Sequence, residues 1–226
     1  MDDYESYIEF KKWDKLFQYS EDDVWQFNKI LAGVTLKDKE ILEVGFGAGS
    51  LLSFLHDQKA NVHGVEIQPR LVQEAHNKGY NVSTSLDHFT PQKFDLIIAL
   101  DVLEHLDKTE MSTFLRSVSD LLHDDGLFIA RFPNCQSPAS LYNQFGDPTH
   151  RQMLSGPIVQ AALEQLPLEL TNIQIGHARS EYTKNIYKRI FKKIIKAVCD
   201  KIVRIALGYS TNLLAGNIVI YVERTK

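Results

Sequence analysis

Short apolar runs alternate with amphipathic stretches through the middle of the chain. The apolar runs predict strands at 39–44, 61–67, 80–85, 94–100 and 126–134, and the amphipathic stretches predict helices at 50–58, 69–78 and 109–122. Strands that alternate with helices of about 10–15 residues are typical of βαβ units. The runs LIIAL and LFIA suit strands that are buried on both faces. We therefore predict a parallel, doubly wound α/β sheet.

The pattern is different on either side of this region. Residues 1–38 read as a helical, aromatic-rich segment in which Trp13 and Phe17, four residues apart, are expected to share a helix face. This segment either packs on the sheet or caps an active site. After residue 134 comes a polar stretch, 135–155, whose length and varied chemistry favour a functional loop. A helix (156–166), a strand (168–178), a basic helix (184–207) and a final strand (212–224) are then expected.

Composition narrows the class of protein. The 226 residues are 44% hydrophobic and 24% charged, which is ordinary for a globular protein. Two cysteines cannot form a disulfide scaffold, the first ten residues contain no apolar core of a signal peptide, and no apolar run reaches the length of a membrane span. We therefore expect a soluble, cytoplasmic protein. The net charge of −4 conceals +7 between residues 184 and 204, so the rest of the chain carries −11, which argues against nucleic-acid binding.

The clearest candidate for a ligand site is a glycine-rich turn between a strand and a helix. Glycines at 45, 47 and 49 permit a tight turn and a close approach of a ligand to the backbone. Ser50 stands where a dinucleotide fingerprint has its third glycine or alanine. Glu43 suits a cationic group better than a pyrophosphate, and Glu66, at the end of the next strand, suits ribose hydroxyls. A ribose ligand with a positive centre points to S-adenosylmethionine.

The chain resembles class I S-adenosylmethionine-dependent methyltransferases over roughly residues 39–134. The resemblance rests on the loop Glu43-Val44-Gly45-Phe46-Gly47-Ala48-Gly49, on Glu66, and on the strand end Leu100-Asp101-Val102-Leu103-Glu104-His105-Leu106. It implies a Rossmann-like, mostly parallel seven-stranded sheet with an N-terminal helical cap (1–38) and an amphipathic helix before the last strand. Residues 39–226 would form the methyltransferase domain of what is a single domain overall.

The same resemblance implies how the cofactor is held, with S-adenosylhomocysteine as the product. Glu43 would lie near the amino group, Glu66 would hold both ribose hydroxyls, and Asp101 would face the methionine end. Ile67 would pack on adenine, while Ser85 departs from the usual acid beside the adenine. The full set of expected cofactor-binding residues is Glu43, Gly45, Phe46, Gly47, Gly49, Glu66, Ile67, Ser85, Leu86 and Asp101.

Two histidines are candidates for the base that removes a proton from the methyl acceptor. His105 follows the fourth strand, where ligands of open α/β sheets bind, and its alternative role is to pack beside the cofactor. His150 lies in the polar stretch, three residues after Asp147, which could orient it. That Asp–His pair could instead only brace the loop. No metal is expected, because Asp101 alone makes no magnesium site and the other histidines lack ligand spacing: His56, His63, His76, His88, His123 and His177.

A second resemblance rests on Pro133-Asn134, Ser137-Pro138, Asp147-x-Thr149-His150 and Ser155, and on the basic amphipathic helix before the last strand. In these features the chain resembles a bacterial methyltransferase group linked with lipopolysaccharide O-antigen and other surface-glycan assembly. That resemblance implies O-methylation of a sugar hydroxyl in a surface glycan (polysaccharide) or its precursor. A small phenol, metabolite or phosphate-like acceptor is the alternative, and a catalytically silent scaffold of a glycan assembly complex is the third. The basic helix 184–207 separates apolar from basic residues, so it either packs on its own sheet or binds the inner face of a membrane as a peripheral contact.

Overall fold

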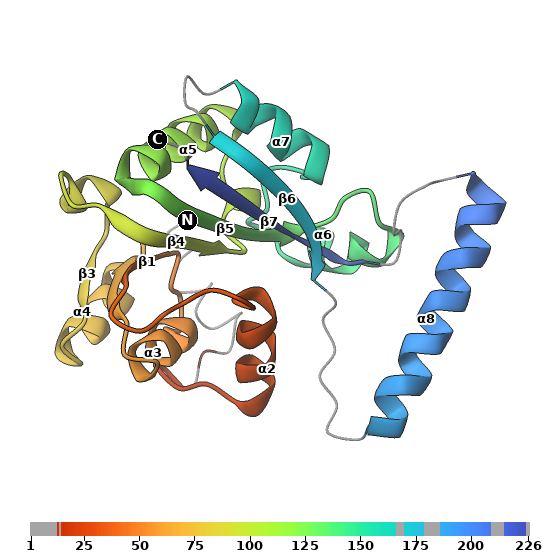
Figure 1. The fold of residues 1–226 in the computed structure, drawn as a ribbon, viewed down its shortest axis with the longest axis horizontal. Coiled ribbons are helices and arrows are strands. Elements are labelled where there is room, and N and C mark those ends of the chain that lie inside the picture. The colour runs from red at the N-terminus through yellow and green to blue at the C-terminus, as the bar shows by residue number, and fades with distance from the viewer. Residues whose placement is uncertain (1–12, 14, 166–169, 179–185, 209–214, 225–226) are drawn as a thin grey trace.

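The apolar runs form one seven-stranded sheet with helices on both of its faces (Figure 1). The computed structural model describes residues 13, 15–165, 170–178, 186–208 and 215–224. The strands are β1 (Glu40–Val44), β2 (Asn61–Val65), β3 (Asn81–Ser83), β4 (Phe94–Leu100), β5 (Leu122–Pro133), β6 (Leu170–Ala178) and β7 (Asn217–Arg224). The helices are α2 (Glu21–Ile30), α3 (Ser50–Asp57), α4 (Pro69–Asn77), α5 (Lys108–Leu121), α6 (Leu141–Gly146), α7 (Gly156–Glu164) and α8 (Ile186–Leu207). Short 3-10 turns lie at Leu86–Phe89, Leu103–His105 and Pro138–Ser140.

The strand order fixes where a ligand can bind. The order is β3-β2-β1-β4-β5-β7-β6, and all neighbours are parallel except at β7, which runs antiparallel to β5 and β6. Successive strands are therefore added on one side of β1 (β2, β3) and then on its other side (β4, β5), so the switch point lies between β1 and β4. Open α/β sheets bind ligands at the carboxyl ends of the strands beside such a switch point. The predicted doubly wound, mostly parallel, seven-stranded sheet is confirmed.

Side chains that alternate along the strands build a core on each face of the sheet. On one face, α5 and α7 bury residues such as Phe114 and Val159 against β4 and β5. On the other face, α2 and α3 bury residues such as Phe27 and Phe54 against β1 and β4. Helix α5 begins with a capping box between Asp107 and Glu110, which holds the start of the helix beside the carboxyl end of β4.

Two predictions of local structure were wrong. Trp13 and Phe17 do not share a helix face: residues 15–17 form a turn, and Phe17 has a φ of 57°, outside the right-handed helical region. The backbone N–H of Phe17 donates to Ala48 O at 2.7 Å, which ties the segment to the glycine loop instead. The polar stretch 135–155 is not an open loop, because it contains the helix α6. Residues 1–12 and 14 of the predicted helical cap (1–38) lie outside the described part of the chain, and the rest of the cap contains α2.

Helix α8 has exposed apolar side chains along its whole length. In Figure 1 it stands away from the sheet and its covering helices. The exposed apolar side chains along it are Tyr187, Ile190, Phe191, Ile194, Ile195, Val198, Ile202 and Ile205. The interpretation in which this helix packs its apolar face on its own sheet is therefore wrong. None of the helices in the described ranges is long and apolar enough to cross a membrane.

Candidate functional site

The glycine loop between β1 and α3 has the backbone that the sequence predicts, but aromatic side chains occupy its outer face. Gly47 and Gly49 have φ of 49° and 74°, a region that favours glycine. A Cβ on Gly47 would come within 2.9 Å of the Trp13 ring, and one on Gly49 within 2.3 Å of the Phe17 ring. The chain's own N-terminal segment therefore makes the close approach that these glycines permit.

Glu66 is tied to this loop by backbone hydrogen bonds. Its Oε2 accepts from Gly47 N at 2.9 Å, and its Oε1 accepts from Gln68 N at 3.0 Å. The side chain is buried, and burial raises the pKa of Glu66, although the hydrogen bonds from Gln68 and Gly47 partly offset that effect. The carboxylate is thus fixed at the end of β2, where the sequence predicts that it accepts from ribose hydroxyls.

Glu43 provides the test of whether the expected cofactor fits. Its Oε2 is buried and has no hydrogen-bond partner among the described residues. Burial, together with the nearby charge of Glu66, raises the pKa of Glu43 well above its usual range, although Leu52 N–H lowers it. A buried carboxyl oxygen without a partner is costly. A cationic group would relieve that cost, so the residues present fit a ligand such as S-adenosylmethionine, whose amino and sulfonium groups are positive.

The residues expected near adenine have different exposures. Ile67 is 59% exposed, which leaves a large apolar surface directly beyond Glu66. Ser85 caps the turn that follows β3 by accepting from Asp87 N at 3.2 Å, and Leu86 packs partly buried on the core. Phe46 is buried between α3, α4 and β3, so its side chain serves packing and only its backbone faces the loop.

Asp101 is at the expected place, at the end of β4, but its carboxylate is engaged by an arginine that was not predicted from the sequence. Arg131 Nε donates to Asp101 Oδ1 at 2.9 Å, and Arg131 Nη2 donates to Oδ2. Burial lowers the pKa of Arg131, yet the charge of Asp101 outweighs it and the pKa is raised. A cationic end of the cofactor would share Asp101 with this guanidinium. The sequence feature that could have pointed to this arginine is its position: Arg131 is the one charged residue inside the apolar run LFIARF of β5.

Backbone hydrogen bonds connect the stretch 135–155 to the turn that follows β4. The N–H groups of Arg151 and Gln152 both donate to Glu104 O, at 2.8 and 3.1 Å. Arg151 also pairs with Asp107 at 2.8 Å and with Glu110 at 2.5 Å, at the start of α5. These contacts carry residues from far along the chain to the carboxyl edge of the sheet.

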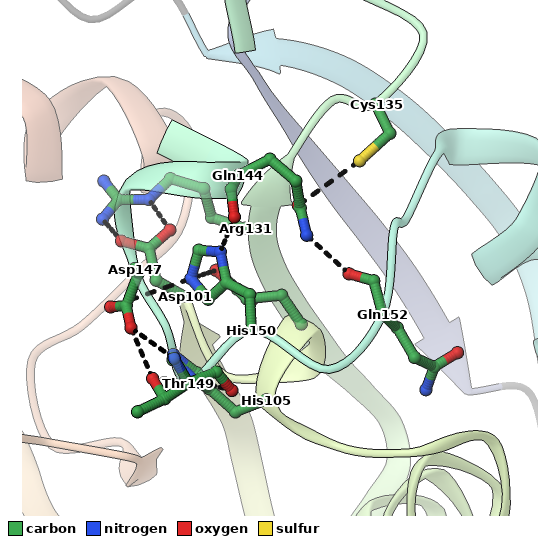
Figure 2. A network of polar contacts seen from close by, with 10 residues as sticks. Asp101, His105, Arg131, Cys135, Gln144, Asp147, Thr149, His150 and Gln152 are labelled. Carbon is green, nitrogen blue, oxygen red and sulfur yellow. Dashed lines mark hydrogen bonds and ion pairs between the residues drawn. The ribbon is translucent and has the colours of Figure 1, made fainter. Parts of the chain in front are cut away.

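This connection brings both candidate histidines together (Figure 2). The ring centroids of His105 and His150 are 4.8 Å apart. His150 Nδ1 lies 3.0 Å from Gln144 O, while its Nε2 lies 3.9 Å from both Glu104 Oε1 and Asp147 Oδ2. His105 Nδ1 lies 3.2 Å from Thr149 O and 3.0 Å from Thr149 Oγ1. We call Glu104, His105, Asp147 and His150 the imidazole–carboxylate cluster.

Three members of this cluster were predicted from the sequence, and the fourth was not. Glu104 was part of the motif, but it had no assigned role. Its side chain is nearly inaccessible to solvent, and its burial is the property that a linear motif does not reveal. The expected hydrogen bond between Asp147 and His150 is not formed, because 3.9 Å is too long for one. Asp147 Oδ1 instead accepts from Thr149 Oγ1 at 2.5 Å and from Thr149 N at 2.9 Å.

Residues 42–128 match a family model described as a methyltransferase domain. No protein of curated function matches the chain in sequence.

Solved structures of methyltransferases share the fold over most of their length. A SAM-dependent methyltransferase from Archaeoglobus fulgidus is 18% identical with a TM-score of 0.68, over 91% of this chain and 95% of that one. The N-methyltransferase NodS from Bradyrhizobium japonicum WM9 is 14% identical with a TM-score of 0.59, over 91% and 97%. Magnesium protoporphyrin IX methyltransferase from Synechocystis, solved with bound SAM, is 16% identical with a TM-score of 0.56, over 90% and 78%.

Proposed function

We propose that this chain, a class I S-adenosylmethionine-dependent methyltransferase, transfers the methyl group to a sugar hydroxyl of a surface glycan or its precursor. The observation that carries the proposal is the imidazole–carboxylate cluster, which lies past the carboxyl end of β4, the strand that pairs with β1. A sugar hydroxyl is a weak nucleophile and must lose its proton as the new bond forms. Imidazoles oriented by fixed partners are suited to assist that loss near neutral pH.

The chain's own residues would divide the work between two ends of the site. Glu43, Glu66 and the glycine loop would hold the cofactor, which supplies the methyl group when bound. The acceptor oxygen would lie on the side of the cluster, about 3 Å from the methyl carbon, so that orientation contributes much of the rate. His150 Nδ1 donates to the Gln144 carbonyl, so Nε2 of the neutral ring carries the lone pair that would accept the proton.

The test is a methyl-transfer assay with labelled S-adenosylmethionine and a panel of acceptors. The panel contains nucleotide sugars, lipid-linked glycans, free polysaccharide and, as the competing class, small phenols and metabolites. Formation of S-adenosylhomocysteine with a methylated sugar product supports the proposal. Turnover of phenols alone would contradict it. Tight binding of the cofactor without turnover of any acceptor would favour the scaffold interpretation.

We also propose that α8 binds the surface of an anionic membrane, where a lipid-linked acceptor would lie. The apolar side chains of α8 are exposed along its length; Phe191 is 64% and Ile202 60% exposed. Lys192 and Lys193 are exposed on the same helix, and the segment 184–204 carries +7. An exposed apolar face combined with basic side chains is typical of helices that lie in a bilayer interface and are attracted to anionic lipids.

Vesicle flotation tests this membrane proposal. We expect the wild type to float with anionic vesicles and less with neutral ones, and added salt should weaken binding. Replacing Phe191, Ile194 and Ile202 together with Ser should abolish flotation, while Ile158→Ser, an exposed apolar residue on α7, should leave it unchanged. Equal flotation of the triple variant would contradict the proposal. Loss of a dimer in the triple variant, without vesicle binding by the wild type, would instead make α8 a subunit interface.

A further inference from the structure

We propose that Glu104, His105 and His150 form a binding site for a divalent transition-metal ion. One ligand atom from each of these three residues lies within 4.8 Å of the others. Ligands of an ion bound at about 2.1 Å lie about 3–4 Å apart, depending on the geometry. A small contraction of the side chains would therefore complete the site. The separation of 3.9 Å between His150 Nε2 and Glu104 Oε1 is too long for a hydrogen bond and suits two ligands of one ion.

The hydrogen bonds of His105 and His150 engage Nδ1 of each imidazole, which leaves Nε2 as the nitrogen for coordination. A carbonyl oxygen only accepts, so His150 Nδ1 donates to Gln144 O and His105 Nδ1 donates to Thr149 O. Thr149 Oγ1 already donates to Asp147 Oδ1, so it also accepts from His105 Nδ1. In the neutral tautomers the lone pair of each ring is then on Nε2. Metal-binding histidines in proteins are commonly fixed in this way, by a carbonyl that accepts from the other ring nitrogen.

The burial and charge of the site favour a cation. Glu104 is almost fully buried, and the His150 side chain is only 7% exposed. Neutral His150 would direct its Nε2 lone pair toward two carboxylates, Glu104 and Asp147, each at 3.9 Å. A cation between these groups turns that repulsion into attraction. Two imidazoles and one carboxylate suit zinc, manganese or iron better than magnesium or calcium, which prefer sites made of oxygen alone.

The role of the ion rests on the proposed function, whereas its binding does not. Three protein ligands leave positions open for an acceptor hydroxyl, and coordination lowers the pKa of that hydroxyl. The hydroxyl O–H bond would break and its proton would pass to the Asp147 carboxylate, next to His150. The O–C bond would form as the C–S bond of the sulfonium breaks, which leaves a neutral thioether. His150 would then act as a ligand and not as the proton acceptor.

The site was not expected from the sequence because its ligands are far apart along the chain. His105 and His150 are separated by 45 residues, and the spacing within Glu104-His105 alone is not a metal motif. The backbone bonds from Arg151 and Gln152 to Glu104 O bring the two parts together.

A titration with Mn²⁺ tests the proposal without requiring turnover. Binding is measured as the loss of the electron paramagnetic resonance signal of the free ion. We expect saturation at one ion per chain for wild type after treatment with a chelator. Glu104→Gln and His150→Ala should each raise the dissociation constant by at least about 10–100-fold. His76→Ala, which removes an exposed imidazole on α4, should bind like the wild type.

Further measurements on the same samples separate this proposal from the proposed function. Calorimetric titration with S-adenosylhomocysteine should give wild-type affinity in Glu104→Gln, which would show that the variant is folded; His105→Gln serves if it is not. Absence of Mn²⁺ uptake by wild type, or uptake unchanged in the cluster variants, would overturn the metal site and leave sugar methylation standing. Mn²⁺ uptake by a protein that methylates no sugar would refute the proposed function and leave the metal site standing.

Discussion

The two ends of the site hold their carboxylates in different ways. At the cofactor end, the hydrogen bonds to Glu43 and Glu66 come from backbone N–H groups, and Glu43 Oε2 has no hydrogen-bond partner in the described part of the chain. At the acceptor end, Glu104 and Asp147 each lie 3.9 Å from Nε2 of the His150 imidazole. The first end therefore requires positive charge from a ligand. The second already contains groups that can carry a proton or hold a cation.

This contrast explains which chemistry belongs to which end. A buried carboxyl group without a cation is destabilising until a cationic ligand arrives, which favours tight binding of that ligand. An imidazole beside two carboxylates can accept a proton or coordinate a cation. Variants at the two ends should therefore affect different measurements.

The largest effect is expected from His150→Ala at the acceptor end. Turnover should fall by about 10²–10⁴-fold, because the acceptor loses the group that takes its proton or holds the activating ion. Cofactor affinity should stay at the wild-type value, since the contacts that position His150 come from Gln144, Glu104 and Asp147 and not from the glycine loop. Steady-state kinetics with a methylated sugar product and calorimetry on the same protein measure the two quantities. Equal loss of both quantities would contradict the separation, and His76→Ala is the control.

A smaller effect, on stability, is expected from Gly49→Ala at the cofactor end. Ala at a φ of 74° is strained, and its Cβ would collide with Phe17 at 2.3 Å. We expect the free energy of unfolding to fall by roughly 2–5 kcal/mol in urea denaturation. Gly79→Ala is a matched control, because Gly79 has a similar φ of 85° and a Cβ added there would meet nothing within 4 Å. It should show the strain alone, about 1–2 kcal/mol. Equal losses of unfolding free energy in Gly49→Ala and Gly79→Ala would mean that the collision with Phe17 contributes nothing.

The smallest effect concerns the pH dependence of stability, and it comes from Glu43. The folded pKa of Glu43 is raised, so the folded state holds a proton that the unfolded state loses above the ordinary value of 4.5. Stability from this group is therefore present at low pH and falls as the pH rises toward the folded pKa. Glu43→Gln removes this decline, so between about pH 5 and 8 its free energy of unfolding should fall less than that of the wild type.

Asp95 supplies the control of opposite sign. Burial raises the pKa of Asp95, but Lys39 and the Glu40 N–H outweigh burial, and the pKa is lowered. Its contribution to stability is lost only as the pH falls below the ordinary value of 3.8. Asp95→Asn should therefore leave the slope between about pH 5 and 8 unchanged. Urea denaturation at several pH values measures both slopes, and identical slopes for Glu43→Gln and wild type would contradict the burial argument.

The cofactor end was largely predictable from the sequence, because its geometry is local. The turn at Gly45, Gly47 and Gly49 and the strand that ends in Glu66 lie within 22 residues of one another, and each follows directly from strand–turn–helix patterning. The same patterning predicted the strand and helix positions of residues 40–134. What it could not predict is the path of Phe17, whose turn is imposed by a backbone hydrogen bond to Ala48 and not by helical periodicity.

The acceptor end was predictable only in part, because its contacts are long-range. His105, Asp147 and His150 were identified by residue type and position, yet nothing in the linear pattern places His150 against His105. That contact depends on hydrogen bonds from residues 151 and 152 to Glu104 O. Likewise, the pairing of Arg131 with Asp101 joins two strands that are neighbours only in the folded sheet. The exposure of α8 depends on tertiary packing, which amphipathic periodicity does not determine.

We expect the carboxylate of Glu66 to hold the ribose of S-adenosylmethionine at the cofactor end. The measurement is isothermal titration of S-adenosylmethionine and of S-adenosylhomocysteine into wild type, Glu66→Ala and, as a control on α4, Glu74→Ala. Wild type and Glu74→Ala should bind with micromolar affinity, and Glu66→Ala should bind at least about 100-fold more weakly, because two charge-assisted hydrogen bonds to the ribose would be lost. Thermal denaturation must show that Glu66→Ala is folded at the temperature of the titration. Undiminished binding by a folded Glu66→Ala protein would mean that Glu66 does not hold the ribose.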